Sequence, residues 1–152
     1  MTLTPLFRLA GLPLLVAACL GSAPVHAQDA LAKAAQETGA ATTPSGLVYR
    51  SLKDGTGASP QATDTVRVHY RGTFTDGREF DSSYKRGQPA TFPLNRVIKC
   101  WTEGVQRIKV GGKAKLTCPS AIAYGERGTP GGPIPPGATL QFEVELLGIE
   151  GK

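Results

Sequence analysis

Side chains able to carry out covalent or acid–base chemistry are scarce in this chain of 152 residues. His26 and His69 are its only histidines, and His69 shares the polar face of an alternating stretch with two arginines, which favours a solvated surface histidine. A serine or cysteine nucleophile needs a neighbouring base, and zinc needs three or four ligands at characteristic spacing; neither pattern is present. Glycine-rich phosphate-binding motifs and paired carboxylates on one element are also missing. We therefore expect no covalent, phosphoryl-transfer or metal-dependent reaction, and neither a cofactor nor a metal ion.

The remaining candidates are aromatic and branched aliphatic side chains that could line one hollow. They are Tyr70, Phe80, Val97, Ile98, Trp101, Tyr124, Ile134 and Phe142. Taken alone, such a set is more typical of a packed core than of a binding site. Two polar features favour a site: Asp81 directly follows Phe80, and Tyr124 opens a glycine-rich loop that a core would not need. The pattern predicts an apolar hollow with a few polar groups at its rim.

Short strands must carry most of these side chains, because period-two alternation dominates the chain after Gly46. Residues 65–74 form the clearest predicted strand, with Val66 and Tyr70 on one face and charged side chains on the other. Further strands are predicted just after Gly46 and over residues 79–81, 90–94, 113–118 and 139–146.

One helix is predicted, over residues 101–108, because Trp101, Val105 and Ile108 recur at helical spacing before a Gly-Gly stop. Residues 125–137 predict a loop rich in glycine and proline. The expected fold class is α+β, a twisted antiparallel β-sheet wrapped around one short α-helix.

The first 27 residues resemble a secretory signal peptide. Arg8 supplies a positive start, residues 9–20 are an apolar stretch of suitable length, and cleavage after Ala27 fits the small-residue pattern. Residues 16–19 also have the form of a lipobox, in which a lipidated Cys19 would become the mature N-terminus. Both interpretations predict an exported protein, periplasmic or secreted, with lipid anchoring through Cys19 as the alternative.

After the leader, residues 28–45 are rich in Ala, Thr and Gln and predict a flexible tether, and residues 46–152 predict one domain. The chain has 17 basic and 12 acidic residues; removing residues 1–27 removes only one basic residue and leaves a net charge of +4. The charges are interspersed, so we expect no nucleic-acid partner. No apolar run reaches the ~18–20 residues of a membrane span, so none is expected.

Two cysteines remain after the leader, Cys100 and Cys118. Cys100 precedes Trp101 at the helix start, and Cys118 ends the inward face of a strand that the helix must cover, so the two could meet. In an exported domain an even pair favours one disulfide, which would stabilise the fold by about 3 kcal/mol through the loop that it closes. The alternative is two separate buried thiols, since free cysteine is common in cores.

Seven sequence blocks, in order over residues 46–150, closely resemble the FKBP-type peptidyl-prolyl isomerases. They are VHYRG at 68–72, DGREFDSS at 76–83, VIKCWTEG at 97–104, VGGKAKL at 110–116, AYG at 123–125, IPPGATL at 134–140 and FEVEL at 142–146. Several independent blocks over about 100 residues are far more specific than a single short motif. The resemblance implies the FKBP-like form of the α+β fold.

The resemblance also implies roles for the matching residues. Trp101 would be the floor of a pocket for a proline ring, with walls from Tyr70, Phe80, Val97, Ile98 and Phe142. The Tyr124 hydroxyl and the Ile98 backbone N–H would bind substrate carbonyls. Asp81 would orient Tyr70 or the substrate, with Arg86 as its ion partner, and Ile134 belongs to a loop over the site.

Two departures from the family pattern affect the pocket. Ala90 stands where the family often has a phenylalanine, which predicts a thinner wall and leaves the binding of bulky macrolide inhibitors open. The segment between Leu94 and Val97 is shorter than in the smallest family members, so Asn95 or Arg96 could fill the position at the pocket entrance.

The expected function is peptidyl-prolyl cis–trans isomerisation of X-Pro bonds in exported proteins, which would assist their folding. The alternative is a non-catalytic FKBP-like chaperone or binding module for proline-containing segments. In both cases the partners are proline-containing polypeptides. The tether is too short for the long helical dimerisation arm of some exported relatives, so we expect a monomer.

Overall fold

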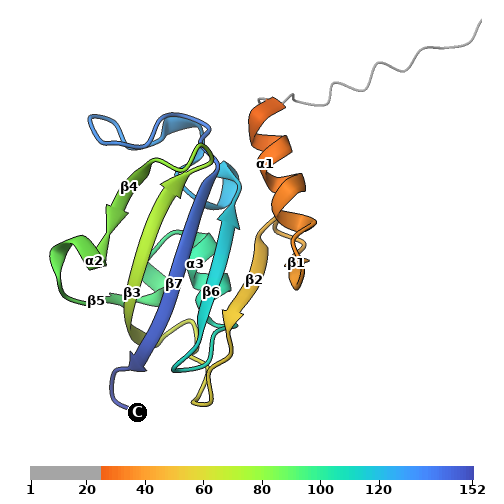
Figure 1. Cartoon of the computed structure of the whole chain (residues 1–152). Coiled ribbons are helices and arrows are strands. Elements are labelled where there is room, and N and C mark those ends of the chain that lie inside the picture. Colours follow the sequence, from red (N-terminus) through yellow and green to blue (C-terminus); the bar gives the residue numbers. More distant parts are fainter. Residues whose placement is uncertain (1–24) are drawn as a thin grey trace, which may run out of the picture.

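The computed structural model describes residues 25–152, which form one sheet of seven strands with helices on both faces (Figure 1). Every strand pairing is antiparallel, the order is β1-β2-β6-β7-β3-β4, and β5 pairs with β3. The strands are β1 (Ala40–Thr42), β2 (Val48–Lys53), β3 (Thr65–Phe74), β4 (Glu79–Ser82), β5 (Ala90–Pro93), β6 (Lys113–Cys118) and β7 (Leu140–Ile149). The predicted signal peptide lies outside the described residues, apart from residues 25–27.

The two longest strands, β3 and β7, form the centre of the sheet, and their alternation explains its two unlike faces. In β3, Val66 and Val68 are completely buried, whereas Arg67 between them is exposed. In β7, Val144 and Leu146 are likewise completely buried. Each such side chain contributes about 1.5–3 kcal/mol by leaving water, so the register that buries one face is strongly specified. The predicted strand over residues 65–74 is confirmed at both ends.

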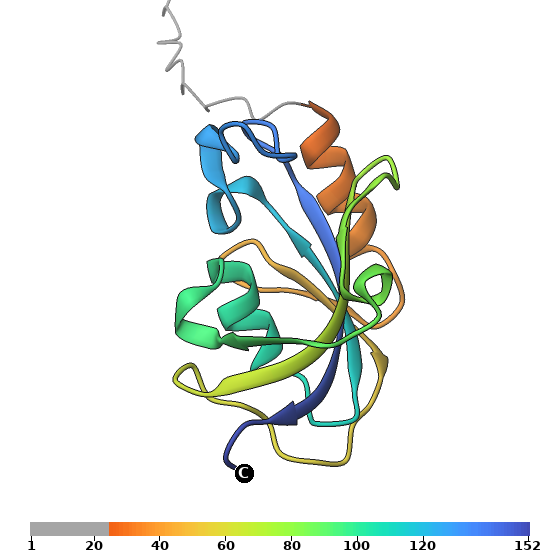
Figure 2. The same cartoon turned by 90° about the vertical axis from the view of Figure 1, so that its left-hand side faces the viewer.

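Helix α3 (Lys99–Val105) lies against the apolar face of the sheet, which curves around it (Figure 2). The helix begins two residues earlier than predicted, because the Ile98 carbonyl accepts the N–H of Thr102 (3.2 Å), and it ends at Val105 instead of Ile108, since residues 106 and 107 form a turn. It approaches β6 closely at Gly104, where a Cβ atom would lie 2.7 Å from a Leu116 methyl carbon. This glycine is what brings the pocket-forming helix onto the sheet.

Two further α-helices correct the prediction of a single helix: α1 (Val25–Ala35) and α2 (Ser83–Arg86). The Ser82 side chain accepts the N–H of Lys85 at the start of α2, and Gly87 ends it in the left-handed region at φ +72°. Three short 3₁₀ helices, η1 (Leu94–Arg96), η2 (Ser120–Ile122) and η3 (Gly125–Arg127), shape the connections. None of the helices described is long and apolar enough to cross a membrane.

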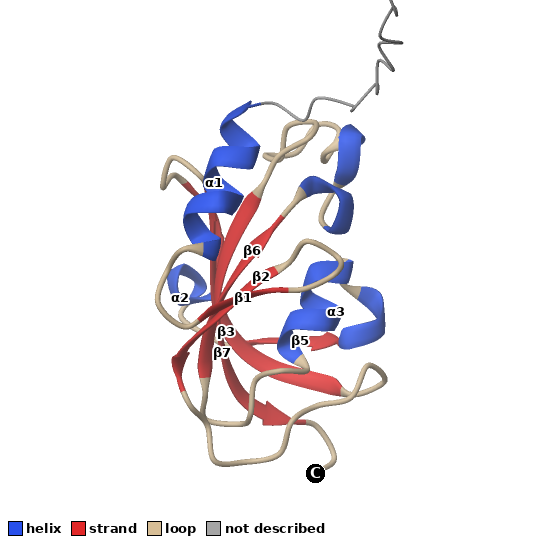
Figure 3. Cartoon of the chain, turned by 90° about the vertical axis from the view of Figure 1, so that its right-hand side faces the viewer, coloured by secondary structure: helices blue, strands red, loops and turns tan. Residues whose placement is uncertain are grey.

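The structure contradicts the flexible tether predicted for residues 28–45. Helix α1 covers the first part of this segment and buries Ala34, and β1 pairs with β2. Glu37 fixes the connection between them, since its carboxylate bonds both Arg50 and Lys115 at 2.8 Å. The prediction failed because the helix is too short to be stable alone, and its order comes from packing against the sheet. Figures 2 and 3 place α1 and α3 on opposite sides of the sheet.

The outer face of the sheet, opposite α3, carries charges that pair with one another. Its ion pairs are Glu37–Arg50, Glu37–Lys115, Arg71–Glu79 (2.6 Å) and Lys113–Glu143 (3.5 Å). The register continues the alternation of sign, because Glu143 stands opposite Arg71 on one side and Lys115 on the other. We call this set the outer-face charge network.

Candidate active site

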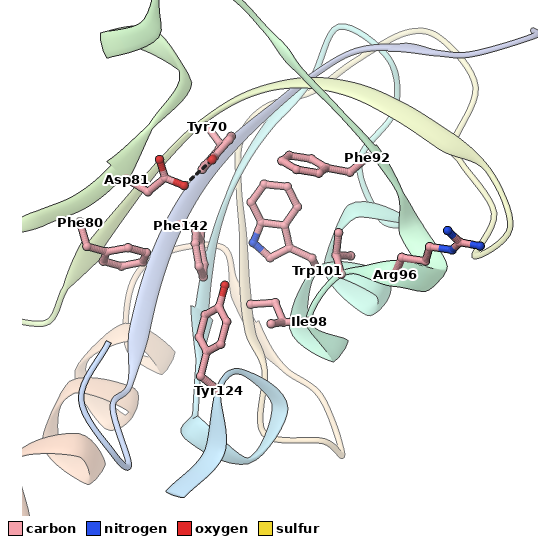
Figure 4. A pocket seen from close by; sticks show the side chains of 10 residues that line it. Tyr70, Phe80, Asp81, Phe92, Arg96, Ile98, Trp101, Tyr124 and Phe142 are labelled. Atoms are coloured by element: carbon pink, nitrogen blue, oxygen red, sulfur yellow. Dashed lines mark hydrogen bonds between the residues drawn. The ribbon is translucent and has the colours of Figure 1, made fainter. Parts of the chain in front are cut away.

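A cavity of about 330 Å³ opens on the apolar side of the molecule, above α3 (Figure 4). Its lining comes from six of the strands and helices and from the two segments before η3 and α3. The lining residues are Tyr70, Phe80, Asp81, Phe92, Arg96, Val97, Ile98, Trp101, Tyr124 and Phe142. The walls are therefore mostly aromatic, with two charged side chains and two tyrosine hydroxyls, a composition typical of a small-ligand site.

The indole of Trp101 is held in place by three rings that meet it edge-on. Tyr70, Phe92 and Phe142 have centroids 5.1, 5.6 and 5.5 Å from that of the indole, with interplanar angles of 84–90°. Each such pair is worth about 0.5–1.5 kcal/mol beyond its buried area. Only 4% of Trp101 is exposed, yet its Nε1 has no hydrogen-bond partner within the described residues. The indole is thus a fixed apolar floor.

Gly72 allows the phenylalanine wall to form. A Cβ atom at this position would lie 2.6 Å from Cζ of Phe80 and 3.0 Å from Cε1 of Phe142. Because Gly72 has no Cβ atom, the rings of Phe80 and Phe142 pack edge-to-face with centroids 5.6 Å apart. The absence of a side chain in the middle of β3 therefore shapes the cavity.

Three side chains join at the rim. The Tyr70 hydroxyl donates to one Asp81 oxygen, and Arg86 Nη1 donates to the other at 2.6 Å. Arg86 Nη2 also donates to the Tyr70 hydroxyl at 2.9 Å, and its guanidinium carbon lies 5.6 Å from the Tyr70 ring centre. The short helix α2 brings the side chain of Arg86 to Asp81, because Asp81 directly precedes the N-cap Ser82 and Arg86 is the last residue of the helix.

This rim triad shifts the pKa values of its members in opposite directions. Burial alone would raise the pKa of Asp81, but the hydrogen bonds from Tyr70 and Arg86 and the Arg86 charge outweigh it and hold the pKa below 3.8. Burial, and then the hydrogen bond to Asp81, raise the pKa of Tyr70 above 10.0. Asp81 is therefore ionised and Tyr70 protonated throughout the neutral range.

Besides the buried Trp101 N–H, the Ile98 backbone N–H and the Tyr124 hydroxyl are cavity donors without a partner in the described chain. Ile98 lies between η1 and α3, and its N–H donates to no backbone acceptor in the part of the chain that the structure describes. The Tyr124 hydroxyl makes no hydrogen bond to any residue between 25 and 152, and 39% of this side chain is exposed. Burial, followed by the charge of Asp81, raises the pKa of Tyr124 above 10.0, so its hydroxyl is a donor at neutral pH.

The structure brings most of the predicted site residues together, with three differences. Ile134 does not line the cavity; it is 5% exposed and anchors the loop, because its carbonyl accepts the Thr129 N–H (2.9 Å) and its N–H donates to the Thr129 hydroxyl (3.0 Å). Arg86 lies at the rim without lining the cavity. Phe92, which sequence analysis placed only in a strand, is a cavity wall, and its two-residue spacing from Ala90 puts both on one face of β5.

The two other open predictions concern Arg96 and His69. Arg96, and not Asn95, lines the cavity entrance. His69 is half-buried: its ring stacks on Tyr84 (centroids 4.6 Å apart), and its Nδ1 lies 2.9 Å from the Ser83 hydroxyl. It is not among the cavity residues, so it has a packing role on the opposite face.

A disulfide behind the cavity joins Cys100 to Cys118, with Cα atoms 5.9 Å apart. Both residues are completely buried. The bridge ties the first turn of α3, directly beside Trp101, to the end of β6. It therefore fixes the floor of the cavity to the sheet.

Comparison with known proteins identifies the class that this fold and cavity define. The model of the family described as FKBP-type peptidyl-prolyl cis-trans isomerase matches residues 57–147. The chain belongs to the FKBP-type peptidyl-prolyl cis–trans isomerase family, as its sequence blocks had indicated.

Several relatives are close in sequence or structure. The FKBP-type isomerase FkpA of Aeromonas hydrophila is 58% identical over 123 residues, which are 81% of this chain and 45% of that protein. FkpA of Escherichia coli K12 is 52% identical over 118 residues, 78% of this chain and 43% of the relative. The crystal structure of FkpA from Escherichia coli has a TM-score of 0.78 at 50% identity and covers 81% of this chain and 57% of that one.

A peptidyl-prolyl cis-trans isomerase from Pseudomonas syringae pv. tomato gives a TM-score of 0.75 at 36% identity and covers 81% of this chain and 90% of that one. This chain spans about half the length of the curated FkpA relatives that it matches. The FKBP-like α+β fold predicted from sequence is confirmed by both structural neighbours.

Proposed function

We propose that this protein is an isomerase that accelerates rotation about X-Pro bonds in exported polypeptides and so assists their folding. The observation that carries the proposal is the cavity itself: an apolar hollow of about 330 Å³, floored by an indole and bordered by the unused Ile98 N–H and Tyr124 O–H donors. It has room for a proline ring, and its donors lie where the flanking carbonyls of a bound polypeptide could reach them.

The reaction needs no nucleophile. A peptide bond resists rotation by ~18–20 kcal/mol because the nitrogen lone pair is delocalised into the carbonyl. X-Pro bonds exchange only over tens to hundreds of seconds at 25 °C. An apolar pocket disfavours the charge-separated resonance form, and interactions that hold the twisted amide better than the planar one lower the barrier. A reduction of about 7 kcal/mol corresponds to an acceleration of about 10⁵-fold.

Residues at different positions around the cavity would perform different parts of the isomerisation. The proline ring would rest on Trp101, between Phe142 and the Tyr70 ring, where water is excluded. The Ile98 N–H and the Tyr124 hydroxyl would hold substrate carbonyls on either side of the rotating bond. The ionised Asp81, held by Arg86, keeps the Tyr70 hydroxyl engaged at the rim and the ring turned into the wall.

We further propose that residues 1–27 direct export and that cleavage leaves Gln28 as the mature N-terminus. The apolar leader and the disulfide support this, because disulfides persist in oxidising compartments. Mass spectrometry of the mature chain tests it. A chain beginning at Gln28 is expected; a lipidated Cys19 at the N-terminus would show anchoring instead, and an intact leader would contradict export.

The activity is tested by NMR exchange on a peptide with one Ala-Pro bond, comparing wild type with Tyr124→Phe. Wild type is expected to accelerate exchange, and Tyr124→Phe to lower kcat/KM about fivefold through loss of one hydrogen bond of about 1 kcal/mol. Tyr84→Phe is the matched control, because Tyr84 is similarly exposed (44%) and does not line the cavity. Peptide binding without faster exchange would overturn the proposal in favour of a non-catalytic binding module.

A further inference from the structure

One charged side chain of the cavity, Arg96, has no part in the proposed rotation of the bond. It is exposed, ends η1 and lines the cavity. Its guanidinium makes no ion pair and no hydrogen bond with any residue in the described range 25–152. Arg86, at the rim, is by contrast neutralised by Asp81 at 2.6 Å. The cavity therefore carries one uncompensated positive charge, and the compensated one lies at its rim.

The backbone under Arg96 is firmly held. Leu94, at the start of η1, is completely buried; its N–H donates to the Asp64 carbonyl (3.0 Å), and its carbonyl accepts the Thr102 hydroxyl (2.5 Å). Figure 4 shows the Trp101 indole between Asp81 and Arg96, with the guanidinium pointing away from the indole. Arg96 thus reaches past the proline site, toward neighbouring residues of a bound polypeptide.

We propose that Arg96 is a specificity-determining residue that favours substrates with an aspartate or glutamate close to the proline. This inference rests on the isomerase function proposed above. A guanidinium binds a carboxylate with two parallel hydrogen bonds, and no carboxylate of the described chain competes for this one. An exposed pair of this kind contributes only a modest factor, so the preference is a matter of a few-fold in kcat/KM.

The test uses two peptide series, each with one Ala-Pro bond, that differ by a single Glu, Gln or Lys. The variable residue follows the proline in one series and stands two residues before it in the other. For wild type at low ionic strength, kcat/KM is expected to be about fivefold higher for Glu than for Lys in at least one series. Arg96→Glu is expected to reverse this ratio, Arg96→Gln to bring it near one, and 1 M NaCl to reduce it through screening.

The matched control is Lys109→Glu, which makes the same charge change at an exposed residue of a separate cavity beside Tyr49. It is expected to leave the ratio unchanged. Equal ratios in wild type and Arg96→Glu, or an equal effect of Lys109→Glu, would overturn the inference while the Gln peptides still report isomerisation. Failure of wild type to isomerise the Gln peptides would overturn the proposed function, and the inference with it.

Discussion

The two faces of the sheet differ in whether the polar groups on them have partners. On the outer face, the outer-face charge network pairs its cations with carboxylates, as Glu37 does with Arg50 and Lys115 at 2.8 Å. On the α3 side, the Ile98 N–H, the Tyr124 hydroxyl and the Arg96 guanidinium border the cavity without a partner in the described chain. Paired groups fix the fold, whereas groups left unpaired beside an apolar hollow are available to a ligand.

The rim triad of Tyr70, Asp81 and Arg86 lies on the cavity side, yet its polar groups are paired like those of the outer face. Asp81 is satisfied by Tyr70 and Arg86, so it cannot also serve as a freely moving base. Its role is to hold the Tyr70 ring against Trp101 (centroids 5.1 Å apart). The contrast between the faces therefore predicts large functional effects on the cavity side and small structural effects on the outer face.

The largest effect is expected from Trp101→Ala, which removes the cavity floor and the partner of three rings. The free energy of unfolding should fall by about 3–5 kcal/mol, and isomerisation should fall to background. Urea unfolding measures the change in the free energy of unfolding, and NMR exchange measures the isomerisation rate. Trp101→Leu, which keeps most of the side-chain volume, should fold and still lose activity at least tenfold. Full activity in this variant would contradict the assignment of Trp101 as the cavity floor. Phe74→Leu is a control, since Phe74 packs on Phe80 outside the cavity.

Removing the disulfide tests how far the cavity floor depends on its attachment to β6. Cys100→Ala with Cys118→Ala should lower the free energy of unfolding by about 3 kcal/mol, by the entropy of the 18-residue loop. A reductant should destabilise wild type by a similar amount and leave the double variant unchanged. Two reactive thiols at these positions in the denatured, unreduced protein would contradict the bridge.

Changing Asp81 tests the rim triad through pH. The folded pKa of Asp81 is lowered from its ordinary value. The ionised carboxylate therefore stabilises the folded rim fully above that ordinary value, and this stabilisation is lost as the pH falls through the folded pKa. Wild-type kcat/KM should be flat through the neutral range and decline only at a pH more acidic than the ordinary pKa of an aspartate. Asp81→Asn should lower kcat/KM about tenfold and abolish this acid limb. A wild-type midpoint near neutral pH would contradict an ionised, paired Asp81.

The smallest effect is expected at two carboxylates outside the cavity, one on the outer face of the sheet and one in the turn between β3 and β4. Glu37→Gln should lower the free energy of unfolding by about 1 kcal/mol, because it removes two ion pairs that anchor α1 and β1. Asp76→Asn, whose exposed carboxylate meets Arg78 alone, should leave the urea midpoint unchanged. Isomerisation should be unaffected by either change, and a loss of activity in Glu37→Gln would show that the two faces are coupled.

The sequence carried enough information to predict most of the fold and the cavity. Alternation identified the central strands because one face of β3 and of β7 is largely buried, and the helix pattern around Trp101 identified α3. The sequence blocks then assigned the cavity residues, and eight of its ten lining residues were named in advance as site residues. The ninth, Arg96, was one of two candidates for the entrance.

The missed features depend on contacts that no local pattern reveals. Phe92 alternates like any strand residue, and only the pairing of β5 with β3 turns it toward Trp101. Helix α1 has only 11 residues and strand β1 only three, too few to be stable alone, and their order comes from Ala34 packing and from the carboxylate of Glu37. Ile134 looked like a wall residue but packs into the core, where it secures the loop over the site.

The three-residue strand β1 has a protective consequence. It covers the free hydrogen-bonding edge of β2, and a strand of this length offers little template for further pairing. A chain trimmed to begin at Gly46 would leave that edge bare and keep every residue that lines the cavity. Such a fragment should self-associate through its bare edge at high concentration, because an uncovered strand offers its N–H and C=O groups to another chain.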